Sequence, residues 1–180
     1  MIFKIQRLHI GFQKRLARLK VLGISMRSVT VASIFSIFMP FSLEVMADRY
    51  PIGDISHAEL LERHEVFKRN YDAYEVPAEI DGLPADLEVK ILFGTWCHDS
   101  EREVPRVLKL LAASGVEEKN ISLIGLDIRK QEPEGRAKVL GIKYTPTFVF
   151  FSGGKEIGRI IERPIISLQD DIAAIASVSR

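Results

Sequence analysis

The sequence contains one cysteine, Cys97, among 180 residues. A single cysteine excludes an internal disulfide framework. It also excludes a Cys-x-x-Cys redox pair, because the fourth position of that motif is Ser100 here. No second cysteine and no histidine pair stands at the spacing of zinc or copper ligands, so we expect neither a metal nor another cofactor.

Clusters of basic residues are also missing from most of the chain. Seven of the 25 basic residues and one of the 24 acidic residues lie in residues 1–47, so the remainder has 18 basic and 23 acidic residues and a net charge of −5. Binding to a phosphate backbone requires lysines and arginines in clusters. Nucleic acid is therefore excluded as an expected partner.

The chain has no apolar run long enough for an ordinary membrane-spanning helix. Residues 28–45 are nearly free of charge, but Pro40 and Glu44 cut the strongly apolar part short of the ~20 residues that a span needs. The small residues up to Ala47 suit signal-peptidase cleavage, and Met26-Arg27 before the apolar run would begin a signal of ordinary length. We interpret residues 1–47 as an N-terminal extension and secretory signal peptide, with translation starting at Met26. An uncleaved membrane anchor is the alternative.

Export places the remaining residues in an oxidising compartment, which we expect to be the periplasm. About 133 residues are left after cleavage, enough for one hydrophobic core. We divide them into an N-terminal helix and connector, residues 48–86, and a core domain, residues 87–180. Contact with the membrane is expected only through an uncleaved signal segment.

Apolar periodicity, prolines and glycines predict the secondary structure. The expected order is helix, strand, helix, strand, helix, hairpin, helix. Crossover helices between strands imply parallel pairing and the hairpin adds antiparallel strands, so we predict an α/β fold with a mixed central sheet and helices on both faces. The predicted elements are a helix from Asp54, its N-cap, to about Tyr74, strand 89–93, helix 98–113, strand 121–128, helix 133–140, strand 147–151, strand 156–161, and a helix from Ser167 to Ile175.

Several motifs together resemble the thioredoxin-like superfamily, in particular its exported bacterial members. Gly153-Gly154 forms the turn of the predicted hairpin, and the resemblance covers residues 54–180. The other residues that carry it are Trp96-Cys97-His98-Asp99-Ser100 at the predicted strand-to-helix turn, Pro105 inside the following helix, and Thr145-Pro146 before a Phe-rich strand. The resemblance implies a thioredoxin fold with a monothiol Cys-x-x-Ser active site.

Cys97, His98 and Ser100 are the expected catalytic residues. Unpaired N–H groups and the partial positive charge of a helix N-terminus stabilise a thiolate. A cationic His98 would add to this effect, and Ser100 could donate a hydrogen bond to the sulfur. The alternative is that Cys97 is an inert buried residue. His57 and His64, in contrast, are expected to be solvated side chains of the first helix.

Trp96, Thr145 and Pro146 are the expected substrate-binding residues. The resemblance implies that Trp96 covers one flank of the thiol and contacts partners, although it could also be a packing residue. It further implies a cis bond before Pro146, where the backbone of Thr145 could pair with an extended peptide. An ordinary trans proline at the start of a strand is the alternative.

The expected function is monothiol thiol–disulfide exchange through Cys97, by mixed-disulfide shuffling or by removal of small-thiol adducts from client proteins. Without a resolving cysteine, release requires an outside thiol or a second cysteine of the client. The expected partners are proteins with cysteines or disulfides and a low-molecular-weight thiol such as glutathione. Whether the protein turns over as an enzyme is left open. A peptide- or protein-binding module without redox turnover is the first alternative, and a degenerate structural protein is the last.

Overall fold

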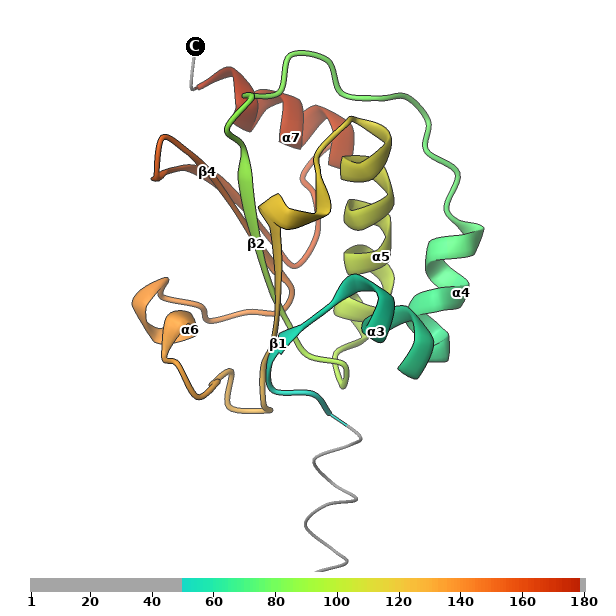
Figure 1. The fold of residues 1–180 in the computed structure, drawn as a ribbon, viewed down its shortest axis with the longest axis vertical. Coiled ribbons are helices and arrows are strands. Elements are labelled where there is room, and N and C mark those ends of the chain that lie inside the picture. The colour runs from blue at the N-terminus through green and yellow to red at the C-terminus, as the bar shows by residue number, and fades with distance from the viewer. Residues whose placement is uncertain (1–49, 179–180) are drawn as a thin grey trace, which may run out of the picture. The chain divides into compact units, whose positions relative to one another are not determined.

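Five strands form one mixed sheet in the computed structural model (Figure 1). The structure describes residues 50–178, so the predicted signal peptide and the start at Met26 lie outside the described residues. The sheet order is β1-β3-β2-β4-β5, with β2 and β3 parallel and the other neighbouring pairs antiparallel. The predicted α/β class with a mixed sheet is confirmed. The strands are β1 (Gly53–Ile55), β2 (Glu88–Phe93), β3 (Ile121–Gly125), β4 (Thr147–Ser152) and β5 (Lys155–Ile161).

Helices cover both faces of this sheet. Phe67 of α4, Leu108 of α5 and Ile172 of α7 belong to the larger hydrophobic core, on one face. On the other face, Ala137 of α6 belongs to a smaller core together with Leu92 of β2. Within residues 50–178, no helix is both long and apolar enough to span a membrane. The helices are α3 (His57–Arg63), α4 (Glu65–Ala73), α5 (His98–Ala113), α6 (Arg136–Val139) and α7 (Leu168–Ser177), with a short 3-10 helix η3 (Glu118–Asn120).

The predicted helix beginning at Asp54 is wrong at its start. Residues 53–55 form β1, which pairs antiparallel with β3 and places Asp54 opposite Ile124. The N-cap of α3 is Ser56, whose Oγ accepts a hydrogen bond from the N–H of Glu59 at 3.1 Å. The helix is then interrupted at His64, whose φ of −124° and ψ of 89° are not helical. Strand pairing with β3 therefore prevails over the local N-cap signal of Asp54.

Helix α5 has the predicted bounds, residues 98 to 113. Pro105 lies inside it and cannot donate a backbone hydrogen bond to the carbonyl of Glu101. The side-chain amide of Asn70 in α4 donates to that carbonyl instead, at 2.8 Å. The ammonium of Lys109 donates to the carbonyl of Tyr71, near the end of α4, at 2.9 Å. These two contacts join α4 to α5, so the segment interpreted as an N-terminal helix and connector packs directly on the core helix.

Strand β3 ends at Gly125, earlier than the predicted residue 128. A side chain at Gly125 would collide with the backbone carbonyl of Pro51, so glycine is required at this close approach. Beyond it, the carboxylate of Asp127 accepts hydrogen bonds at 2.8 Å from the N–H groups of Arg129 and Gln131. A carboxylate that bonds the following backbone N–H groups favours a turn over an extended strand.

Helix α6 begins at Arg136 and not at the predicted residue 133. The buried carboxylate of Glu132 accepts hydrogen bonds from the N–H groups of Glu134 at 2.8 Å and Ala137 at 3.2 Å. Burial acts to raise the pKa of Glu132, but the backbone hydrogen bonds and the charge of Arg136 outweigh it and lower that pKa below its ordinary value. Glu132 thus fixes the start of this short helix.

The C-terminal hairpin and the last helix agree with the prediction. Gly153 and Gly154 have φ of 58° and 71°, the left-handed region that a two-residue hairpin turn requires. The carboxylate of Asp86 accepts hydrogen bonds from Ser152 Oγ at 2.8 Å and from the N–H of Gly153 at 2.6 Å. Ser167 is the N-cap of α7, as predicted, and accepts from the N–H of the third helical residue.

Candidate functional site

Cys97 lies at the junction of β2 and α5, as predicted. Its N–H donates to the carbonyl of Gly94 at 3.0 Å, which closes a turn after the strand, and its own carbonyl accepts from the N–H of Glu101 at 3.0 Å. Cys97 is therefore the N-cap residue of α5. Its side chain is partly exposed and forms no disulfide. The turn thus places a free thiol at a helix N-terminus.

The Cys97 thiol contacts the segment that contains Pro146. Its Sγ donates a hydrogen bond to the carbonyl oxygen of Thr145 at 3.1 Å. The Thr145–Pro146 peptide bond is cis, the isomer implied by the resemblance, and the carbonyl of Pro146 accepts from the N–H of Glu162 at 2.7 Å. Both Thr145 and Pro146 are buried. The fold thus brings together three of the predicted site residues from two parts of the chain.

Ser100 is fully buried in the first turn of α5. Its Oγ accepts a hydrogen bond from the N–H of Gly94 at 3.4 Å. Among the described residues, no hydrogen bond joins Ser100 to Cys97. In this state Ser100 therefore supports the turn before the helix and does not contact the thiol through a hydrogen bond.

Trp96 lies against the end of β3. The indole Nε1–H donates to the carbonyl of Leu126 at 2.9 Å, and the ammonium of Lys130 lies 5.6 Å from the ring centroid. A side chain at Gly94 would overlap the indole, so the glycine before Trp96 provides the space for the ring. Trp96 is partly exposed and directly precedes Cys97 in the chain.

The other side chains of the first turn contact charged neighbours. The imidazole of His98 is 89% exposed and its Nδ1 lies 3.2 Å from Glu101 Oε2. The carboxylate of Asp99 lies 2.8 Å from the Arg102 guanidinium and 3.8 Å from that of Arg163. Two arginines therefore balance the charge of Asp99, which would otherwise oppose a thiolate nearby.

A buried carboxylate lies further along α5. Glu103 is 2% exposed and pairs with Arg102 at 2.7 Å and with Arg106 at 3.2 Å. The hydrogen bond to Glu103, followed by the nearby negative charges, raises the pKa of the Arg102 guanidinium against the opposing effect of burial. The same arginine thus contacts both Asp99 and Glu103 and fixes the charge pattern after Cys97.

Two contributors to this region were not predicted from the sequence. Arg163 approaches Asp99 from the segment after β5, and Asn70 reaches the Glu101 carbonyl from α4. Pro105 does signal that a carbonyl four residues earlier needs another donor. Nothing in the local sequence indicates that Asn70 supplies it.

The described residues contain no group of three or more His, Cys, Asp or Glu side chains that could hold a metal ion. Cys97 provides a free, partly exposed thiol at this site. Deprotonation would remove the hydrogen bond to Thr145 and leave the sulfur close to the unpaired N–H groups of the first turn. The arrangement can therefore present one sulfur nucleophile.

Comparison with known proteins adds no relative. No protein-family model matches the chain, and no curated protein sequence or solved structure matches it.

Proposed function

We propose that the protein is an exported monothiol catalyst of thiol–disulfide exchange, with Cys97 as the nucleophile. The observation that carries this proposal is the partly exposed Cys97 thiol at the N-terminus of α5, 3.1 Å from the Thr145 carbonyl. In the chain, Trp96 directly precedes Cys97 and Pro146 directly follows Thr145.

We further propose that the α/β domain is a variant of the thioredoxin fold. The mixed five-strand sheet, the helix capped by Cys97 and the hairpin at Gly153-Gly154 support this. The short β1, which runs antiparallel to β3, is a feature that the sequence resemblance did not predict.

The proposed reaction has two exchange steps. The Cys97 thiolate attacks one sulfur of a client or small-molecule disulfide, a new S–S bond forms, the old one breaks, and the departing thiolate takes up a proton. A second thiol, from the client or from glutathione, then attacks the sulfur that is bonded to Cys97, forms a new disulfide with it and releases the Cys97 thiolate. The reaction exchanges one disulfide for another, and its electrons come from the attacking thiols.

The second thiol must come from another molecule, because the residue at position 100 is not a cysteine. Cys97 is the only cysteine of the chain, and Ser100 occupies the position of a resolving cysteine. The mixed disulfide is therefore expected to persist until another thiol arrives. Export supplies the matching substrates, since disulfides form and persist in oxidising compartments.

Mass spectrometry tests the proposal. The protein is incubated with oxidised glutathione, and then with reduced glutathione. We expect one glutathione on Cys97 after the first step, loss of that adduct after the second, and no adduct on the Cys97→Ser variant. Absence of an adduct on the native protein would contradict the proposal.

The second candidate is a peptide-binding module without redox turnover. It is favoured by one observation: Tyr144, beside the Thr145–Pro146 segment, is a large apolar side chain that is 52% exposed. Capture of clients by Cys97→Ser at wild-type strength would support the binding module. Loss of covalent complexes in that variant, together with loss of its activity in exchange, would support catalysis.

A further inference from the structure

Positive charge lies beside Trp96, the residue before Cys97. The ammonium of Lys130 lies 5.6 Å from the centroid of the indole ring. The indole is fixed by its hydrogen bond to the Leu126 carbonyl, and the N–H of Leu126 donates to the carbonyl of Phe93 at 2.7 Å. The segment that contains Lys130 therefore runs beside the turn that contains the thiol. The Cα atoms of Trp96 and Cys97 are only about 3.8 Å apart.

Lys130 has an unusual backbone conformation. Its φ is 61°, in the left-handed region that glycine and asparagine adopt more readily than lysine. Two hydrogen bonds close this turn: the N–H of Lys130 donates to the carbonyl of Asp127 at 2.9 Å, and the N–H of Asp127 donates to the carbonyl of Gln131 at 3.0 Å. Residues in such conformations cluster at functional sites. A lysine is thus held at a conformational cost next to the indole.

The same segment lines a cavity of about 470 Å³. Three of the lining side chains are cationic, and none of them forms an ion pair within residues 50–178. These residues are Arg129, Lys130 and Lys138. The acidic residue of the lining, Glu132, is buried; it accepts hydrogen bonds from two backbone N–H groups and lies 3.6 Å from Arg136. The carboxylate of Asp127, on the neighbouring turn, also accepts two backbone N–H groups. The cavity therefore has an excess of positive charge.

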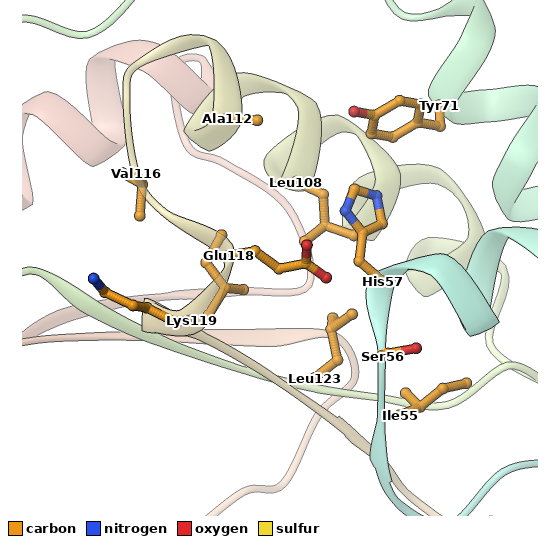
Figure 2. Close-up of a pocket in the computed structure, with 11 residues that line it drawn as sticks. Ile55, Ser56, His57, Tyr71, Leu108, Ala112, Val116, Glu118, Lys119 and Leu123 are labelled. Atoms are coloured by element: carbon orange, nitrogen blue, oxygen red, sulfur yellow. The ribbon is translucent and has the colours of Figure 1, made fainter.

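A larger cavity of about 630 Å³ has a different charge pattern (Figure 2). It lies at the end of α5 that is opposite to Cys97. Figure 2 shows its acidic side chain, Glu118, extending over the space, whereas its basic side chain, Lys119, extends away. Lys119 also pairs with Glu117 at 2.9 Å. An excess of cationic side chains is therefore specific to the cavity beside Trp96, on the side of the thiol.

The charges that follow Cys97 in α5 cancel one another. Asp99 and Glu103 each contact two arginines, and Glu101 lies beside His98. The arginines that make these contacts are Arg102, Arg106 and Arg163. Three carboxylates thus face three guanidinium groups. The excess positive charge near the thiol is therefore on the side of Trp96.

We propose that Cys97 reacts preferentially with disulfides that carry a carboxylate close to their sulfur atoms. This rests on the proposed exchange reaction and names its substrate class. The carboxylate of the substrate lies at the Lys130 ammonium beside Trp96, and Arg129 and Lys138 add to the positive potential there. A cleft lined by charges of one sign raises the local concentration of substrates of the opposite sign. Lys130 determines specificity and takes no part in the exchange of bonds.

Three small disulfides that differ in charge test the proposal: dithiodipropionate is anionic, hydroxyethyl disulfide is neutral and cystamine is cationic. In each reaction the Cys97 thiolate forms an S–S bond to one half of the reagent, the original S–S bond breaks, and the other half leaves as a thiolate that takes up a proton. Mass spectrometry of the full chain gives the rate. Each rate is divided by that of a neutral reference thiol, N-acetylcysteine amide, with the same reagent.

The expected order is anionic, neutral, cationic. At an ionic strength of about 20 mM, we expect the normalised rate of dithiodipropionate to exceed that of hydroxyethyl disulfide at least about threefold. The difference should shrink in about 0.5 M salt, because salt screens charges near the surface.

Two matched variants locate the effect. Lys130→Gln should lower the ratio of the anionic to the neutral rate about threefold, and any general effect on the reactivity of the thiol cancels in this ratio. Lys155→Gln is the control, because Lys155 is an exposed lysine at the other end of the six-residue strand β4, about 20 Å from Pro146. It should change the ratio less than about 1.5-fold.

The outcomes separate this proposal from the exchange activity. No reaction of Cys97 with any of the three disulfides would contradict the exchange activity and the selectivity together. Equal normalised rates for the anionic and neutral reagents, or a preference that is unchanged in high salt, would overturn only the selectivity. An equal change of the ratio in Lys130→Gln and Lys155→Gln would overturn it as well.

Discussion

The Cys97 sulfur donates its proton to the carbonyl oxygen of Thr145, 3.1 Å away, although 48 residues separate them in the chain. Through this bond the thiol contacts the segment proposed to bind clients. When the proton leaves, the bond is lost, and sulfur and carbonyl oxygen repel each other. Formation of the nucleophile and release of the Thr145 carbonyl are therefore coupled.

A second thiol at position 100 should change the outcome of exchange. We expect Ser100→Cys to form an internal disulfide with Cys97 after reaction with oxidised glutathione, so that the glutathione adduct does not accumulate. Mass spectrometry distinguishes the two products. Ser100→Ala is the control: it should keep the adduct and cost about 1 kcal/mol of stability, because the Gly94 N–H loses its acceptor. A persistent adduct on Ser100→Cys would count against the proposed geometry.

The contact between Asn70 and Glu101 should contribute more to stability because Pro105 lies in the helix. Asn70→Ala leaves the Glu101 carbonyl without its donor and should lower the free energy of unfolding by about 1–2 kcal/mol in urea titrations. In the Pro105→Ala background, the new backbone N–H bonds that carbonyl, so the same substitution should cost about half as much. Equal costs in both backgrounds would show that Asn70 acts in another way.

Stability should fall as the pH drops through the range in which free histidine titrates. Burial is the main cause that lowers the pKa of both His57 and His64 below 6.5, so the unfolded chain binds protons more readily than the folded one. Their contribution is complete above about pH 6.5 and is lost as the pH falls below that value. The measurement is the free energy of unfolding between about pH 7.5 and pH 5.5.

Leucine substitutions identify the groups responsible for this dependence. His57→Leu should reduce the slope, and the double variant with His64→Leu should remove most of it. At about pH 8, His57→Leu should be as stable as the wild type or up to about 1 kcal/mol more stable, because it removes a buried nitrogen without a partner. An unchanged slope in the double variant would disprove this assignment.

The fluorescence of Trp96, the only tryptophan of the chain, should depend on how its indole packs against Gly94. Gly94→Ala places a methyl group where the indole lies, so the ring must leave the Leu126 carbonyl. We expect a red-shifted emission, stronger quenching by acrylamide and a loss of about 1–3 kcal/mol of stability. Lys130→Gln is the control, since it removes only the cation over the ring and should cost less than about 1 kcal/mol. Identical emission of Gly94→Ala and wild type would contradict this packing.

The elements that the sequence predicted well are those fixed by local signals. The bounds of α5 follow from apolar periodicity between the turn at Cys97 and the stop at Gly115, and the hairpin follows from Gly153-Gly154. Strand β1 was missed because its three residues, Gly53–Ile55, show no strand pattern. It depends on pairing with β3, about 70 residues later in the chain.

In the candidate site too, features set by local sequence were predicted, and contacts between distant parts of the chain were not. The position of Cys97 at the helix N-terminus follows from neighbouring residues, and the cis bond between Thr145 and Pro146 is the isomer that the resemblance implied. The sequence did not indicate that Ser100 would bond to Gly94, or that Arg163 would reach Asp99. The burial of His57 Nε2 was also missed, because it depends on Tyr71 and on the end of α5 packing around the ring.

The central claim is that the folded surroundings make Cys97 a nucleophile. The most direct measurement compares the rate at which oxidised glutathione modifies Cys97 in the native protein and in the urea-unfolded chain, at the same pH. The account predicts that the native thiol reacts at least about tenfold faster, because the helix N-terminus stabilises the attacking thiolate. A native rate equal to or lower than the unfolded rate would contradict it.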